Sequence, residues 1–148
     1  MIYRVTFCIC LLNFVAFCSF CQTTSEEIVD HFFQVYKKDP SAAIDDFFSK
    51  DKWISGKKDD VTNLKVQLKN WIDLVGEYHG YELITVKTIG NSLKLYSYLV
   101  KYDREPIRFI FLLYKPADTW RPQSFSFNRS MDDELEEAAK AYRLKENY

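Results

Sequence analysis

The segment 107–114 constrains the fold of this 148-residue chain most strongly, because it is apolar on both of its alternating sides. Successive side chains of an extended strand point to opposite faces of a sheet. One face would carry Ile107, Phe109, Phe111 and Leu113, and the other would carry Ile110, Leu112 and Tyr114. A sheet with one face in water has polar residues on that face. We therefore expect both faces of this sheet to be covered.

This segment is one of four predicted strands. Alternating or continuous apolar patterns cover about Tyr81 to Thr88, Leu93 to Tyr102, Ile107 to Tyr114 and Trp120 to Asn128. Turn sequences separate them, at Gly90-Asn91, at residues 103–106 and at residues 115–118. Short connections between successive strands predict an antiparallel meander.

Three amphipathic helices are predicted before the sheet. Thr24-Ser25-Glu26-Glu27 is a capping-box sequence for the first, and Asp39-Pro40 is typical of the start of the second. Asp59 or Asp60 begins the third, which Gly76 ends. We therefore expect an α+β fold in which three N-terminal helices pack on a curved four-stranded antiparallel meander, followed by a short C-terminal helix.

That last helix has an apolar stripe formed by Met131, Leu135, Ala138 and Tyr142. The three N-terminal helices can cover one face of the sheet. The C-terminal helix could cover the other face, and so could a second subunit packed sheet to sheet. The residues leave these two alternatives open.

The first 21 residues have the pattern of an export signal. Arg4 precedes an apolar run, and the small residues Ser19 and Cys21 stand before Gln22 as in a cleavage site. The run is interrupted by Asn13 and is shorter than the roughly 20 residues that a membrane span needs. We expect residues 1–21 to be a signal peptide and residues 22–148 to be one exported domain, periplasmic or secreted. Retention as an anchor and lipidation of Cys21 are the alternatives.

All four cysteines of the chain, Cys8, Cys10, Cys18 and Cys21, lie in that predicted signal. A mature domain without them has no disulfide, no zinc–thiolate site and no cysteine nucleophile. The chain has two histidines and a net charge of −1 with interspersed signs, which favours neither a metal site nor nucleic-acid binding. No paired-carboxylate, phosphate-loop or serine-nucleophile motif occurs, so we predict no catalytic residue and no cofactor.

Several runs resemble those of secreted Bacteroidota proteins in the NTF2-like, or cystatin-like, α+β superfamily. They are Leu74 to Leu83, Tyr98 to Tyr102, Pro106 to Phe109, Tyr114-Lys115, Trp120 and Phe125 to Phe127. The resemblance implies that the sheet wraps around the helices to form a conical cavity. It implies no particular reaction, because one scaffold hosts many functions.

Six residues are candidates for lining such a cavity. They are Tyr36, Trp53, Trp71, Tyr98, Arg108 and Tyr114. Five are aromatic, as is common in sites for apolar ligands. Arg108 is a charge in an apolar strand that must extend to solvent, pair with another residue, or bind an anion. His79, between two glycines, is a further candidate base or ligand, and the plain alternative is that it is an exposed turn residue.

From these features we expect an exported noncatalytic domain that binds a small apolar ligand or a protein partner. A cavity enzyme of the isomerase or hydratase type and a structural subunit that dimerises through the sheet are the alternatives. No nucleic acid is expected as a partner, and no membrane span is expected after cleavage.

Overall fold

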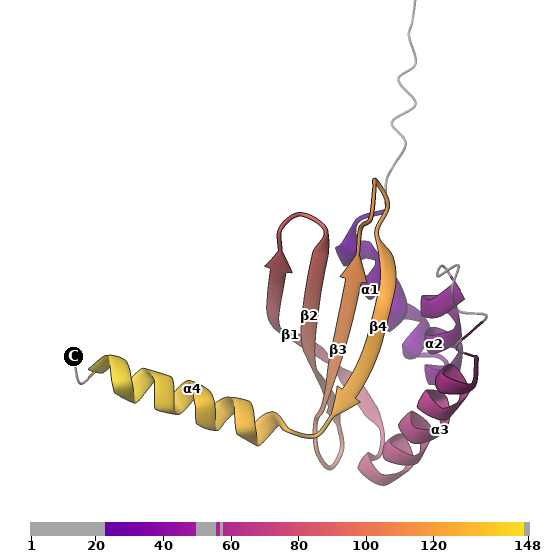
Figure 1. The fold of residues 1–148 in the computed structure, drawn as a ribbon. Coiled ribbons are helices and arrows are strands. Elements are labelled where there is room, and N and C mark those ends of the chain that lie inside the picture. Colours follow the sequence, from indigo (N-terminus) through magenta and orange to yellow (C-terminus); the bar gives the residue numbers. More distant parts are fainter. Residues whose placement is uncertain (1–22, 50–55, 57, 147–148) are drawn as a thin grey trace, which may run out of the picture.

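The computed structural model describes residues 23–49, 56 and 58–146. Three helices come first: α1 (Ser25–Tyr36), α2 (Pro40–Ser49) and α3 (Lys58–Val75) (Figure 1). The strands β1 (Tyr78–Ile89), β2 (Leu93–Tyr102), β3 (Ile107–Tyr114) and β4 (Arg121–Asn128) follow, and then α4 (Met131–Glu146). The predicted succession of three helices, a four-stranded sheet and a C-terminal helix is confirmed. The predicted signal and Trp53 lie outside the described residues.

The sheet is the antiparallel meander that the short turns predict, with the strand order β1-β2-β3-β4. The register places Tyr98 opposite Phe109 and Phe111 opposite Phe125, so these rings share one face. The first strand begins at Tyr78, three residues earlier than the pattern indicates. Two positions interrupt its pairing with β2, one after Tyr78 and one between Leu83 and Thr85.

Local signals in the sequence determine where the helices begin and end. The Thr24 hydroxyl accepts the Glu27 amide at 3.2 Å, and the Glu27 carboxylate accepts the Thr24 amide at 2.9 Å. The Asp39 carboxylate accepts the amides of Ser41 and Ala42 at 2.8 and 3.0 Å at the start of α2. Gly76 follows α3 with a φ of 94°, a conformation that glycine adopts without strain. The predicted capping box, second cap and glycine stop are therefore all present.

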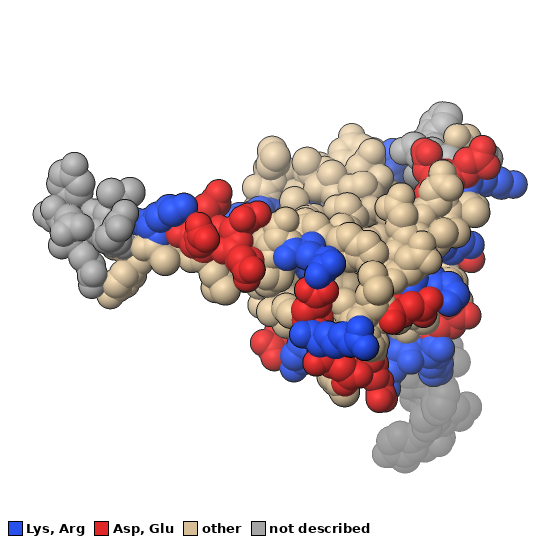
Figure 2. Space-filling model, turned by 90° about the horizontal axis from the view of Figure 1, so that it is seen from below, with Lys and Arg blue, Asp and Glu red and all other residues tan. Residues whose placement is uncertain are grey.

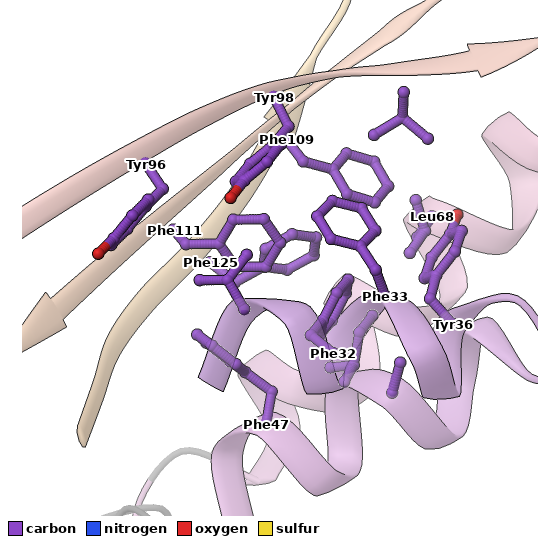
Figure 3. Packing of buried hydrophobic residues seen from close by; sticks show 14 of the residues in the cluster. Phe32, Phe33, Tyr36, Phe47, Leu68, Tyr96, Tyr98, Phe109, Phe111 and Phe125 are labelled. Carbon is purple, nitrogen blue, oxygen red and sulfur yellow. The ribbon is translucent and has the colours of Figure 1, made fainter. Parts of the chain in front are cut away.

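An aromatic core joins α1 and α2 to one face of the sheet (Figure 3). Phe32 of α1 lies 4.9 Å from Phe111 and 5.1 Å from Phe125 between ring centroids. Phe109 lies 5.2 Å from Phe125 and 5.3 Å from Tyr36. Such edge-on and tilted contacts are the favoured arrangements of aromatic rings, and they add to the burial of the rings.

The two faces of the sheet differ in their cover. The helices lie behind one face of the sheet (Figure 1). Tyr96 and Tyr98 point from the sheet toward the helices (Figure 3), and both side chains are buried. The opposite face carries half-buried leucines and isoleucine, and no helix of the described chain lies across it. We call this the outer face.

The C-terminal helix extends away from the sheet as an arm (Figures 1 and 2). Leu135 and Tyr142, which belong to its predicted apolar stripe, are 68% and 65% exposed. Of the two predicted alternatives, the one in which this helix covers the second face of the sheet is therefore wrong. Acidic side chains occupy the part of the arm nearest the body in Figure 2.

The aromatic core generates a stability prediction. Replacing Phe109, which is fully buried, with alanine removes its ring contacts and leaves a cavity. We expect a loss of about 3–5 kcal/mol in the free energy of unfolding, measured by denaturant titration. Val66→Ala on α3 is the control, because Val66 is 55% exposed and alanine favours a helix. Equal unfolding midpoints for the two variants would contradict this description of the core.

Candidate functional site

Two of the residues predicted to line a cavity, Tyr36 and Tyr98, are packed inside the core. The hydroxyl groups of Tyr36 and Tyr102 form a buried hydrogen bond with each other. Burial raises the pKa of Tyr98 and of Tyr102 to about 12, so these phenols stay protonated at neutral pH. Burial likewise raises the pKa of Tyr36. The Tyr36–Tyr102 hydrogen bond therefore joins the last turn of α1 to β2.

The other described candidates lie elsewhere. Arg108 and Tyr114 are on the outer face, where Arg108 Nε donates to Ser97 Oγ at 2.9 Å and the Arg121 guanidinium lies 5.6 Å from the Tyr114 ring. Trp71 of α3 and Phe127 form a T-shaped ring contact, with centroids 5.1 Å apart. The structure thus brings Tyr36 and Tyr98 to the core and the others to separate surfaces, and Trp53 lies outside the described residues.

Aromatic rings occupy the space between α1, α2 and the middle of the sheet (Figure 3). The hollows that the structure describes lie nearer the surface. One of about 260 Å³ lies between α2 and α3, beside Ile44, Leu68 and Ile72. A wider one of about 640 Å³ lies where α1 meets the start of β1, beside Phe33, Lys37, Tyr78, His79 and Lys101.

His79, the other candidate base, is held in a structural clamp. Its Nε2 lies 2.6 Å from Asp103 Oδ1, and Asp103 Oδ2 accepts the Glu77 amide at 2.7 Å. The Glu77 amide, and secondly His79, lower the pKa of the Asp103 carboxyl. A Cβ on Gly76 would lie 2.6 Å from Asp103 Oδ2, so the glycine leaves room for this contact. The clamp holds the end of α3 against the turn between β2 and β3.

His31 is also paired, with Nε2 at 3.0 Å from Asp46 Oδ2. Among the described residues, no group of three or more histidine, cysteine, aspartate or glutamate side chains is placed to hold a metal ion. The buried side-chain polar atoms of the described part all have hydrogen-bond partners.

A second polar cluster joins the first turn of α1 to β2. The Tyr96 hydroxyl donates to Glu26 Oε1 at 2.6 Å, and Lys94 Nζ approaches the same oxygen at 3.0 Å. Ser25 Oγ donates to Glu26 Oε2 at 2.9 Å. The Tyr96 hydrogen bond is the main reason that the pKa of Glu26 falls from its ordinary 4.5 to about 2. The ionised carboxylate is therefore the form that stabilises the fold.

This cluster predicts a dependence of stability on pH. Because the pKa of Glu26 is lowered in the folded state, its contribution is present above pH 4.5 and is lost as the pH falls towards 2. Glu26→Gln should lower the free energy of unfolding by about 1 kcal/mol at pH 7, a small value because the carboxylate is 56% exposed. In denaturant titrations from pH 7 to pH 2, the difference from wild type should shrink below pH 4.5.

Tyr96→Phe is the matched partner variant, because it removes the same hydrogen bond from the other side. It should reduce the acid-dependent loss of stability that Glu26 causes. A difference between Glu26→Gln and wild type that stays constant down to pH 2 would contradict the assignment.

The most exposed apolar side chains of the sheet lie on β1. Tyr81, Leu83, Ile84, Val86 and Ile89 are 37%, 54%, 38%, 38% and 74% exposed. We call these five residues the β1 surface. By their register with β2, Tyr81, Leu83 and Val86 lie on the helix side of the sheet and Ile89 lies on the outer face. Exposed apolar side chains gathered on one strand often mark interaction sites.

The position of β1 in the sheet explains this exposure. β1 is an edge strand, paired with β2 on one side and with no strand of the described chain on the other. Tyr81 stacks on Phe33 of α1, with ring centroids 3.7 Å apart, and marks the limit of the helical cover. Leu83 pairs with Tyr98 and Val86 pairs with Tyr96, so both lie on the side of the sheet that the helices cover. They remain exposed because the helices do not reach as far as these two residues.

None of the β1 surface residues was among the six candidates from the sequence. The apolar run Leu83-Ile84 and the later Val86 and Ile89 were visible in a predicted strand. Their exposure depends on which strand forms the edge of the sheet and on how far α1 reaches, and neither is encoded in a local pattern.

Comparisons of the chain with protein-family models, with curated proteins and with solved structures find no match. In the part of the chain that the structure describes, none of the helices combines the length and the apolar character that crossing a membrane requires. The β1 surface, defined by its geometry alone, is the candidate functional site.

Proposed function

We propose that this chain is an exported noncatalytic domain that binds a protein partner through the β1 surface. The observation that carries the proposal is the row of exposed apolar side chains on an edge strand. Such a strand offers backbone donors and acceptors together with apolar side chains. These are the two elements that proteins use when an extended segment of a partner adds to a sheet.

The shape of the surface favours a polypeptide over a small apolar ligand. β1 has 12 residues, which in an extended strand span roughly 40 Å. A small molecule binds in a concave site that buries most of its surface. The middle of the fold is occupied by Phe32, Phe109, Phe111 and other rings (Figure 3), whereas the exposed apolar residues follow β1 along its length.

The edge strand lacks two of the devices with which soluble sheets protect an edge, proline and short length, although it has charged side chains and shifts in its register. Sheets commonly protect edges with prolines, with short strands, or with charged side chains. β1 is the longest strand of this sheet, contains no proline, and carries Glu82 and Lys87 among its apolar residues. A partner that binds this strand would explain why a long apolar strand without proline lies at the edge of the sheet.

Site-specific photo-cross-linking tests this function. A photoreactive amino acid in place of Thr88, which is exposed on β1, should give a protein adduct in the cells that make this chain. The control replaces Gln67, which is exposed on α3, and should give none. Absence of an adduct from position 88, or equal adducts from both positions, would contradict a partner site on β1.

A further inference from the structure

We propose that the partner is a second copy of this chain, with the two β1 strands paired antiparallel so that Glu82 of each copy lies opposite Lys87 of the other. This inference rests on the proposed function and specifies its partner. It follows from the charges on β1 and from the bulge in the middle of the strand.

The bulge places Glu82 and Lys87 on the same face of the sheet. In a regular strand, residues five positions apart point to opposite faces. In β1 the register shifts between Leu83 and Thr85, so that Glu82 pairs with Leu99 and Lys87 pairs with Leu95. Leu95 and Leu99 are four positions apart in β2 and share its outer face. Glu82 and Lys87 therefore lie on the outer face as well.

The same shift brings two apolar residues together on the other face. Leu83 pairs with Tyr98, and Val86 pairs with Tyr96. Both tyrosines are buried on the helix side of β2. Leu83 and Val86 are thus exposed neighbours on the helix side, although three positions separate them along the chain.

A two-fold axis through the bulge pairs residues that lie on the same face of the sheet. In a symmetric dimer, a contact of one residue with another occurs twice, once in each direction. Setting Glu82 opposite Lys87 also sets Leu83 opposite Val86 and Tyr81 opposite Thr88. In each of these pairs the register with β2 places both residues on the same face. The axis passes between Ile84 and Thr85, where the two bulges meet.

Charge selects this register over its neighbours. A shift by two residues in one direction places Glu82 opposite Thr85, and a shift in the other direction places it opposite Ile89. Either shift removes both opposite-charge pairs. Glu82 already contacts Lys101 of its own sheet at 2.8 Å, so Lys87 of the second copy would complete a row of alternating charges. Opposite charges and apolar side chains directly across two strands stabilise their pairing.

In this arrangement the second copy covers both exposed parts of β1, its edge backbone and its apolar side chains. It joins two four-stranded sheets into one of eight strands, so that the edge backbone of each copy gains partners. It also covers part of the side chains of Leu83 and Val86, which are 54% and 38% exposed in the single chain.

Reciprocal charge reversal tests the proposal on the full chain. Sedimentation equilibrium should show a concentration-dependent dimer for the wild type. Glu82→Lys places lysine opposite lysine at two positions of the dimer, and Lys87→Glu places glutamate opposite glutamate. Each variant alone should have a dissociation constant raised about tenfold. An equimolar mixture should form a heterodimer of near wild-type affinity, because every cross-strand pair then joins opposite charges.

Lys69→Glu is the matched control, because Lys69 is an exposed lysine that pairs with Asp73 on α3, away from β1. It should leave the dissociation constant unchanged. Circular dichroism on thermal unfolding checks that each variant is folded. A wild type that stays monomeric at all concentrations would overturn the proposal. So would a dimer that is insensitive to both β1 reversals, or a mixture that fails to regain affinity.

The two proposals can fail separately. An adduct from position 88 with a different protein, together with a monomeric wild type, would overturn the β1 dimer and leave the proposed function standing. No adduct from position 88 and no self-association would overturn both.

Discussion

The packing of α1 against the middle of the sheet determines the rest of this structure. Two polar contacts hold the helix at its ends, Glu26 with Tyr96 at the first turn and Tyr36 with Tyr102 at the last. Between them, Phe32 and Phe33 insert among the rings of β2, β3 and β4. The aromatic side chains that could have lined a binding cavity are used instead to join the layers. The most exposed apolar side chains of the sheet lie on β1, at the limit of the helical cover.

Local patterns predicted much of this fold. The capping box at Thr24, the Asp39 cap and the glycine stop at Gly76 each act within a few residues, and each is present in the structure. The change from helical to alternating apolar spacing placed the four strands, and the short turns between them implied the meander. These signals are local, so a single sequence suffices to read them.

Features that depend on distant contacts could not be read in this way. The stripe on α4 indicates which side of the helix is apolar but does not say where the helix points. Alternation separates Tyr98 from Leu99 on β2, but only the register between strands shows that Tyr98 belongs to the core while Arg108 and Tyr114 lie on the outer face. The bulge between Leu83 and Thr85 has no signature in the apolar pattern, yet it decides which side chains of β1 share a face.

In the proposed dimer, β1 is open in the single chain and becomes paired only when two copies meet. Amide hydrogen exchange at low and high protein concentration tests it most directly, because edge amides exchange quickly unless they gain hydrogen-bond acceptors. The amides of residues 82–88 that point away from β2 should exchange quickly in dilute protein and slowly in concentrated protein. Those of β3 should be protected equally in both. Protection of the β1 edge that is already complete in dilute protein would contradict the account.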